Sequence, residues 1–206
     1  MINNDLLYYI PSGEFGKEGV LGLLKTHPEI RFVSLVGIDL AGNDTDEKVP
    51  IELFLKNYDD FFAGTAVQTD GSSVVLMNIA TLNDARVDMV ADDSVNWYVD
   101  YNEDHLYSNG RPVGTLRIPC FLLHNGKFID SRSILKESCA FVAEKLKGLL
   151  ASGKPVKGME DLPVDEIEDI KFTIGTELEF WVKTPSETET VQHLSISQRL
   201  QEQYWQ

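Results

Sequence analysis

Apolar residues recur along the chain at two spacings, and each spacing predicts one kind of element. Intervals of three and four residues predict helices over 18–25, 51–62 and 131–150. In the longest of these, one stripe contains the apolar residues Leu135, Cys139, Val142, Leu146 and Leu149. Asp130 or Ser131 stands where the cap of this helix is expected. The pattern therefore predicts few helices, of which one is long.

Short apolar runs bounded by turn residues predict the strands. A nearly continuous run over 30–38 ends in the turn-rich segment 39–44, and a return strand is expected over 45–49. Further strands are predicted over 74–79, 86–90, 95–101, 115–124 and 127–129. Asn125-Gly126 between the last two is typical of a hairpin turn. Many short strands with few helices predict an α+β domain on a mainly antiparallel sheet.

The regular pattern stops after the long predicted helix. From 151 to 170 the chain is rich in Gly, Pro, Lys and acidic residues, which indicates an acidic linker. A further strand is predicted near Phe172. We therefore expect a domain over 1–150, the linker over 151–170, and an incomplete second domain over 171–206.

The charge of the chain argues against two classes of partner. Acidic residues outnumber Lys and Arg by 33 to 18, which gives a formal net charge of −15. Nucleic-acid binding requires basic side chains that neutralise phosphates, so we expect no nucleic-acid partner. Direct binding to an anionic membrane is not expected for the same reason.

Neither a targeting segment nor a cysteine-based site is indicated by the sequence. No apolar run has the length of a membrane span, and the first residues carry no basic stretch before a hydrophobic core. We therefore expect a cytoplasmic protein. Cys120 and Cys139 have no metal-ligand spacing, so buried free thiols are the favoured interpretation.

Two carboxylates near the end of the chain are the first candidate for chemistry. In Gly175-Thr176-Glu177-Leu178-Glu179-Phe180, one apolar residue separates Glu177 from Glu179. On a strand, both side chains would point from one face about 7 Å apart and could hold hard cations. The alternative is an exposed polar face of a strand, and the residues alone leave both open.

Three other places carry candidate polar residues, each with a structural alternative. Asp39 ends a predicted buried strand, where a side chain is held by the sheet yet presented to solvent or to a neighbour, but Asp also suits an ordinary turn. Asp70 and Ser72 belong to Asp70-Gly71-Ser72-Ser73, which is either an anion-binding nest or a plain turn. Arg132 could meet a phosphate or carboxylate, or lie on the surface.

Taken in order, the motifs resemble the N-terminal half of glutamine synthetases. The resemblance spans residues 29 to 182 and rests on Asp39-Leu40-Ala41-Gly42, Asp70-Gly71-Ser72-Ser73, Asp130-Ser131-Arg132 and Gly175-Thr176-Glu177-Leu178-Glu179-Phe180. Each motif is weak alone, and their order makes the set specific. The resemblance implies a β-grasp (ubiquitin-like) domain up to about residue 150 and a catalytic domain that starts near Lys171.

The resemblance also implies a reaction and roles for single residues. Such an enzyme joins the glutamate γ-carboxylate to ammonia through γ-glutamyl phosphate, with ATP and Mg²⁺ or Mn²⁺. Glu177 and Glu179 would be metal ligands. Asp39 would bind and deprotonate ammonium in the active site of a neighbouring subunit. A shared site requires a ring-like homo-oligomer, whose small-molecule partners would be glutamate, ATP and ammonia.

Departures from the family pattern leave alternatives open. Gly37-Ile38 replaces the usual Phe-Thr before the loop aspartate, Ala91 replaces the proline before Asp92, and Ser131 replaces the proline before Arg132. The ligated amine could therefore differ from ammonia, and a non-enzymatic β-grasp interaction module is a further alternative. The family's nucleotide site and remaining ligands would follow Glu179. We therefore expect the front part of a longer enzyme, inactive alone and without a tightly bound cofactor.

Overall fold

One long strand, β7 (Pro112–His124), organises the first part of the chain in the computed structural model. Its first half pairs in parallel with β2 (Ile30–Ile38) and antiparallel with β6 (Trp97–Leu106). Its second half pairs antiparallel with β5 (Arg86–Ala91) and β8 (Lys127–Phe128). Every second residue from Leu116 to Leu122 is fully buried, as the period of a strand requires.

The structure describes residues 4–153, 157–158, 167–177 and 179. By its internal contacts the chain divides into a first unit, Met1–Asp165, and a second unit, Glu166–Gln206. The two units are described separately below.

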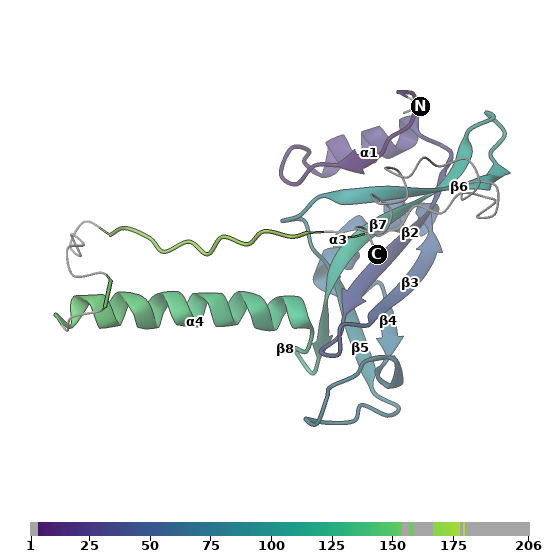
Figure 1. Cartoon of the computed structure of the whole chain (residues 1–206). Helices are drawn as coiled ribbons and strands as arrows, with labels where there is room; N and C mark the ends of the chain where they lie inside the picture. Colours follow the sequence, from purple (N-terminus) through teal and green to yellow (C-terminus); the bar gives the residue numbers. More distant parts are fainter. Residues whose placement is uncertain (1–3, 154–156, 159–166, 178, 180–206) are drawn as a thin grey trace, which may run out of the picture. The chain divides into compact units, whose positions relative to one another are not determined.

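The sheet of the first unit has strand order β1-β6-β7-β2-β3, while β5 pairs with the second half of β7 and β4 pairs with β5 (Figure 1). Its remaining strands are β1 (Tyr9–Ile10), β3 (Asp44–Pro50) and β4 (Gln68–Asp70). All pairings are antiparallel except that of β2 with β7. The predicted α+β class with a mainly antiparallel sheet is thus confirmed.

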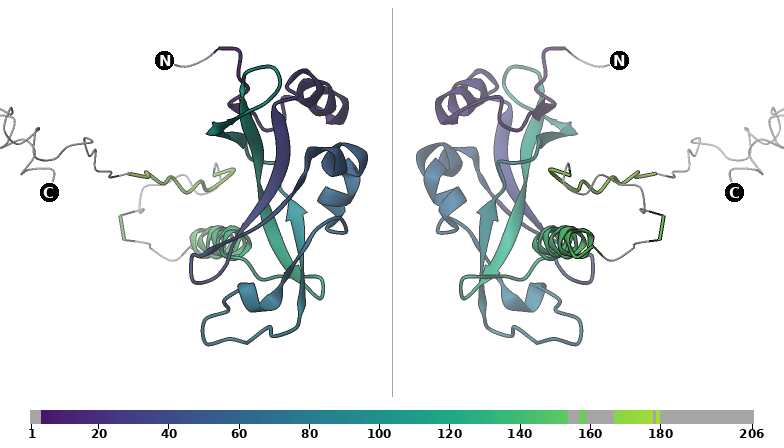
Figure 2. Two further views of the ribbon diagram at one scale, coloured as in Figure 1. Left: turned by 90° about the vertical axis from the view of Figure 1, so that its right-hand side faces the viewer. Right: turned by 90° about the vertical axis from the view of Figure 1, so that its left-hand side faces the viewer.

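Three helices cover one face of this sheet, and a fourth leaves from the other side (Figure 2). They are α1 (Lys17–Thr26), α2 (Ile51–Lys56), α3 (Tyr58–Ala63) and α4 (Ser131–Ala151), and a short 3₁₀ turn covers Gly71–Ser73. Phe54 and Phe61, fully buried, join α2 and α3 to the core with ring centroids 4.9 Å apart. None of the described helices has the length and apolar character to cross a membrane.

Two predictions for the helices need correction. The single helix expected over 51–62 is interrupted at Asn57, whose φ of −116° and ψ of 34° are not helical, so α2 and α3 are separate. Along α4 the predicted apolar stripe is exposed at Leu135, Val142 and Leu149. Cys120 is buried as predicted, whereas Cys139 on this helix is only half-buried.

The strand predicted over 74–79 is also wrong. The chain turns back within it, through a single bridge between Leu76 and Ala80 around Asn78, which has a φ of 57°. A left-handed residue cannot continue an extended strand. The short strands β1 and β4 had not been predicted, because two- and three-residue segments are too short to show a period.

The described part of the second unit contains no strand. Residues 167–177 and 179 have neither helical nor extended pairing, so the strand predicted near Phe172 is not found there. A strand without a partner lacks the hydrogen bonds that define it. Leu178 and Phe180 lie outside the described residues.

Candidate functional site

Asp39 lies at the end of β2, in the turn that leads to β3, and its side chain is only 1% exposed. Its Oδ1 accepts hydrogen bonds from the backbone N–H groups of Ala41 and Asn43, at 2.8 and 2.9 Å. Its Oδ2 accepts from the Asn43 side-chain amide at 3.2 Å and from the Val75 N–H at 3.0 Å. We had expected a side chain presented to solvent or to a neighbour, and its burial corrects that expectation.

The surroundings of Asp39 keep its carboxylate charged. Burial alone raises the pKa of this carboxyl, but the hydrogen bonds from Val75, Asn43 and Ala41 outweigh burial and hold the pKa below its ordinary value. Both oxygens have two donors, which is the usual capacity of a carboxylate. The group therefore organises the turn as an anion, and its role toward ammonium stays a prediction.

The Asp70-Gly71-Ser72-Ser73 motif forms a structured turn. Asp70 accepts from the Ser72 N–H at 2.7 Å, which caps the 3₁₀ turn, and the pKa of the Asp70 carboxyl is lowered by hydrogen bonds from the Ser72 side chain and then from this N–H. The Gly71 N–H donates to the Ala85 carbonyl at 2.7 Å. Because Asp70 already takes the Ser72 N–H, this donor is not free for an external anion.

Gly71 allows this turn to lie against the following loop. A Cβ at Gly71 would stand 2.1 Å from the carbonyl oxygen of Leu82, a backbone atom that cannot move aside locally. The close approach places the segment after the turn so that Val75 reaches Asp39. The sequence motif alone does not indicate this close approach, because glycine is common in turns of any kind.

Arg132 lies in the first turn of α4 and forms an ion pair with Asp92, which is 3% exposed. Asp92 also accepts from the Ser94 N–H and hydroxyl. Burial raises the pKa of the Asp92 carboxyl, but the bonds from Ser94 and Arg132 hold it below its ordinary value. The Arg132 guanidinium carbon lies 5.1 Å from the ring centroid of Phe121, so the side chain is held between a charge and a ring.

The start of α4 is fixed to the sheet by two further residues. Asp130, which is fully buried, accepts from the N–H and hydroxyl of Ser133 and from the Leu122 N–H of β7. The Ser131 hydroxyl donates to the carbonyl of Ile38 at 3.2 Å. Of the two residues proposed as cap, Asp130 is the N-cap. Ser131 instead connects α4 to the end of β2, directly beside Asp39.

These contacts tie two of the four sequence motifs, at Asp39 and at the start of α4, to segments that lie beside other motifs or elsewhere in the first unit. The links are Val75 to Asp39, Ser131 to Ile38, and Arg132 to Asp92. Glu177 and Glu179 belong to the second unit, where both are exposed. Among the described residues, no group of three or more His, Cys, Asp or Glu side chains is placed to hold a metal ion.

A second buried carboxylate had no place among the sequence predictions. Glu29, just before β2, is fully buried, and its oxygens lie 3.0 to 3.1 Å from nitrogens of His27, Asn109 and Arg111. Burial raises the pKa of its carboxyl, but its hydrogen bonds hold it below the ordinary value. Asn109 and Arg111 follow 80 and 82 residues later, so the local sequence around His27 and Glu29 could not reveal the whole cluster.

The comparisons with known proteins give limited information. No family model and no curated protein matches the chain. One solved structure that matches is a cryo-EM structure of Plasmodium falciparum glutamine synthetase, with 18% identity and a TM-score of 0.45. The match covers 65% of this chain and 24% of that chain, so it spans about a quarter of that protein's length. A likeness of this size does not assign the chain to a family.

Proposed function

We propose that this chain forms the N-terminal part of an ATP-dependent carboxylate–amine ligase of the glutamine synthetase type. The enzyme would join the glutamate γ-carboxylate to ammonia, or to another amine, through γ-glutamyl phosphate. One observation carries the proposal: Val75, just after the Asp70 motif, and Ser131 of the α4 motif both form hydrogen bonds at the end of β2, to Asp39 and to its neighbour Ile38. Independent surface turns would have no reason to be connected in this way.

In the proposed reaction, Asp39 attracts the ammonium ion. Its low pKa suits electrostatic binding of a cation and makes the carboxylate a weak base, so binding is the stronger part of its role. The longest of its four hydrogen bonds, at 3.2 Å, comes from the Asn43 side-chain amide. An ammonium ion would replace this amide at Oδ2 while the backbone donors keep the carboxylate in position.

Glu177 and Glu179 would be ligands for Mg²⁺ or Mn²⁺. Carboxylate oxygens are the ligand type that these ions prefer, so the donor set fits in kind. When bound, the ions would neutralise phosphate charge during transfer. Two carboxylates supply few of the six oxygens that such an ion takes, so the residues described here are not expected to bind it tightly or to catalyse alone.

The remaining parts of the proposal concern fold and assembly. The first unit would be a β-grasp domain, and the turn after β2 would complete the active site of a neighbouring subunit in a ring-like homo-oligomer. Ala41 and Asn43 in this turn are exposed, which makes them available to a neighbour. A cytoplasmic location is the corresponding expectation.

A non-catalytic interaction module is the second candidate. The observation that favours it is the saturated carboxylate of Asp39, which has no spare acceptor position in the described structure. In this interpretation the network at the end of β2 would only hold α4 and the loops in place.

The test starts from the gene and then measures catalysis. If the reading frame continues past Gln206, the complete protein should release phosphate only when ATP, glutamate and an amine are all present, with ammonia, methylamine and putrescine compared. Asp39→Asn should lower kcat/KM, and Asn43→Ala should lower the KM for ammonium. Unfolding midpoints of both variants separate catalysis from folding. No nucleotide-dependent turnover with any of these amines would overturn the proposal in favour of the interaction module.

A further inference from the structure

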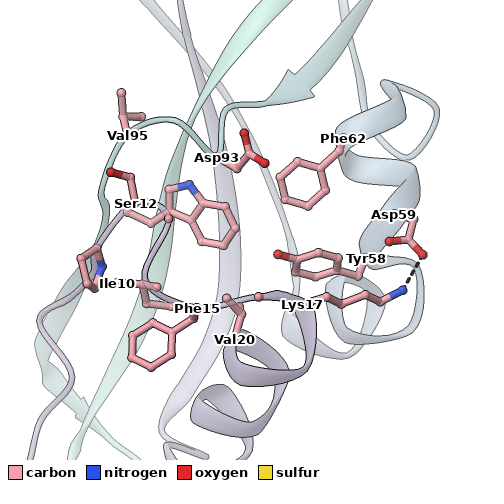
Figure 3. Close-up of a pocket in the computed structure, with 14 residues that line it drawn as sticks. Ile10, Ser12, Phe15, Lys17, Val20, Tyr58, Asp59, Phe62, Asp93 and Val95 are labelled. Atoms are coloured by element: carbon pink, nitrogen blue, oxygen red, sulfur yellow. Dashed lines mark hydrogen bonds and ion pairs between the residues drawn. The ribbon is translucent and has the colours of Figure 1, made fainter.

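A cavity of about 420 Å³ opens in the first unit (Figure 3). It lies between the loop that joins β1 to α1, the helix α3, and the loop that joins β5 to β6. Its volume falls within the range of small-molecule sites, about 300 to 1,000 Å³. None of the sequence motifs contributes a residue to it, so it needs an explanation of its own.

Aromatic rings form one wall of this cavity. Tyr58 and Phe62 lie one helical turn apart on α3 with ring centroids 4.9 Å apart, and Phe62 stacks on Trp97 at 6.0 Å. Trp97 is 4% exposed and is fixed by a 2.8 Å hydrogen bond from its Nε1 to the Asp92 carbonyl. Phe54 packs against both Tyr58 and Trp97 from the core. The wall is therefore formed before any ligand arrives.

Negative charge is placed beside these rings. Asp59 and Asp93 both line the cavity, and Figure 3 shows the carboxylate of Asp93 beside the ring of Phe62. The pKa of the Tyr58 hydroxyl is raised by burial and, in addition, by the charges of Asp93 and Asp59. The second and third causes indicate that the potential at the aromatic wall is negative. A cation there gains from both the carboxylates and the ring faces.

The chain already places one ammonium group at the edge of this cavity. Lys17 at the start of α1 forms an ion pair with Asp59, and its Nζ lies 5.7 Å from the ring centroid of Tyr58. The Lys17 and Asp59 side chains are 43% and 76% exposed, so the pair is weak and can exchange with another cation. Lys17 thus shows which chemistry suits the wall without filling the cavity.

We propose that this cavity binds a small organic ammonium ion. Its cationic nitrogen would lie against Tyr58, Phe62 and Trp97, Asp93 would supply the counter-charge, and Lys17 would compete for the same surface. The assignment does not depend on the ligase proposal, because none of these side chains has a role in the proposed ligase reaction. Failure of one proposal therefore leaves the other intact.

The first experiment compares two probes of nearly equal shape, choline and its uncharged analogue 3,3-dimethylbutan-1-ol. Both are titrated into the 206-residue chain while the indole N–H resonance of Trp97 is followed by NMR. We expect choline to shift this resonance and to bind at least about fivefold more tightly than the alcohol, because only choline gains the cation–π and carboxylate terms. Equal affinity would overturn the proposal, as would a peptide with one trimethyllysine that binds more tightly than choline.

Charge variants at the exposed edge provide the second test. Asp93→Asn should weaken choline binding by at least about threefold, whereas Lys17→Ala should strengthen it, since the competing ammonium is gone. Asp100→Asn on β6 and Lys25→Ala on α1 change the net charge equally and do not line the cavity. If each variant behaves like its matched control, the proposal is wrong. These side chains are exposed, so folding should be unaffected.

Discussion

The two ends of strand β2 each hold a buried carboxylate, and the two are stabilised in different ways. Glu29 precedes the strand and meets side chains, those of His27, Asn109 and Arg111. Asp39 ends the strand and meets mainly backbone N–H groups. The side-chain partners depend on the identities of three residues, two of them distant in the sequence, whereas backbone donors persist whatever the side chains are. The position of the Asp39 carboxylate therefore depends on the course of the backbone, and that of the Glu29 carboxylate depends on which side chains surround it.

The largest expected effect comes from removing the acceptor at the Asp39 end. Asp39→Ala leaves the N–H groups of Ala41, Asn43 and Val75 without their partner and should reduce the free energy of unfolding by about 3 kcal/mol. Urea unfolding measures this loss, with the exposed Asp44→Ala as control. A loss below that of the control would show that the turn does not need its carboxylate.

The Glu29 end should be less sensitive, because its partners can adjust. Arg111 keeps 31% of its side chain exposed, so it can turn to water when Glu29 loses its charge. We expect Glu29→Gln to cost about 2 kcal/mol in the same urea experiment. Glu52→Gln removes the exposed ion pair with Arg31 and should cost less than about 1 kcal/mol. An equal loss of unfolding free energy in both variants would show that the buried ion pair of Glu29 contributes no more than the exposed ion pair of Glu52.

Acid should act on both ends in the same direction. The pKa values of Glu29 and Asp39 are held below 4.5 and 3.8, so folding favours their charged forms. Their contribution to stability is complete above these ordinary values and is lost as the pH falls toward the lower folded values. Glu29→Gln and Asp39→Asn should each flatten the fall in stability below about pH 5, as measured by thermal unfolding. A variant that keeps the slope of the parent chain would exclude that carboxylate as a cause.

Salt concentration should change the stabilising effect of the two carboxylates to different extents, and this is the smallest of the expected differences. The ion pair of Glu29 with the partly exposed Arg111 is screened by ions, whereas the short hydrogen bonds of Asp39 to backbone donors are not. The loss of unfolding free energy caused by Glu29→Gln should become smaller by roughly a few tenths of a kcal/mol between low and high salt. The loss caused by Asp39→Asn should stay constant. Parallel urea titrations at two salt concentrations measure the difference, and identical changes for both variants would contradict it.

Local patterns predicted the elements whose causes lie within a few residues. The apolar run over 30–38 forms the strand β2, the spacing over 131–150 predicted the helix α4 although not its burial, and Asp130 caps α4 as its position suggests. The turn at Asp39 was foreseen as Asx chemistry, because Ala41 and Asn43 are its immediate neighbours.

Longer-range causes were missed for the same reason. Asp39 receives a hydrogen bond from Val75, and Glu29 receives one from Arg111. Both partners are distant in the sequence, so neither contact can be predicted from the neighbouring residues. The strand predicted over 74–79 does not form because Asn78 adopts a left-handed conformation, although the apolar run before it is typical of a strand. For Glu177 and Glu179, the alternation predicted a strand, but a strand also needs a partner.

The parallel pairing at the centre of the sheet has a kinetic consequence. Ile30 of β2 is in register with Gly114 of β7, so the two strands can meet only after a loop of more than 80 residues has closed. Closing that loop costs about 4 kcal/mol in chain entropy, and only contacts that form after closure offset this cost. The β6–β7 hairpin closes a far shorter loop, between Leu106 and Pro112, and should form first as the template on which β2 docks. Refolding of this unit should therefore be slow, on the order of milliseconds to seconds, and mutations in the hairpin should change its rate more than mutations in β3.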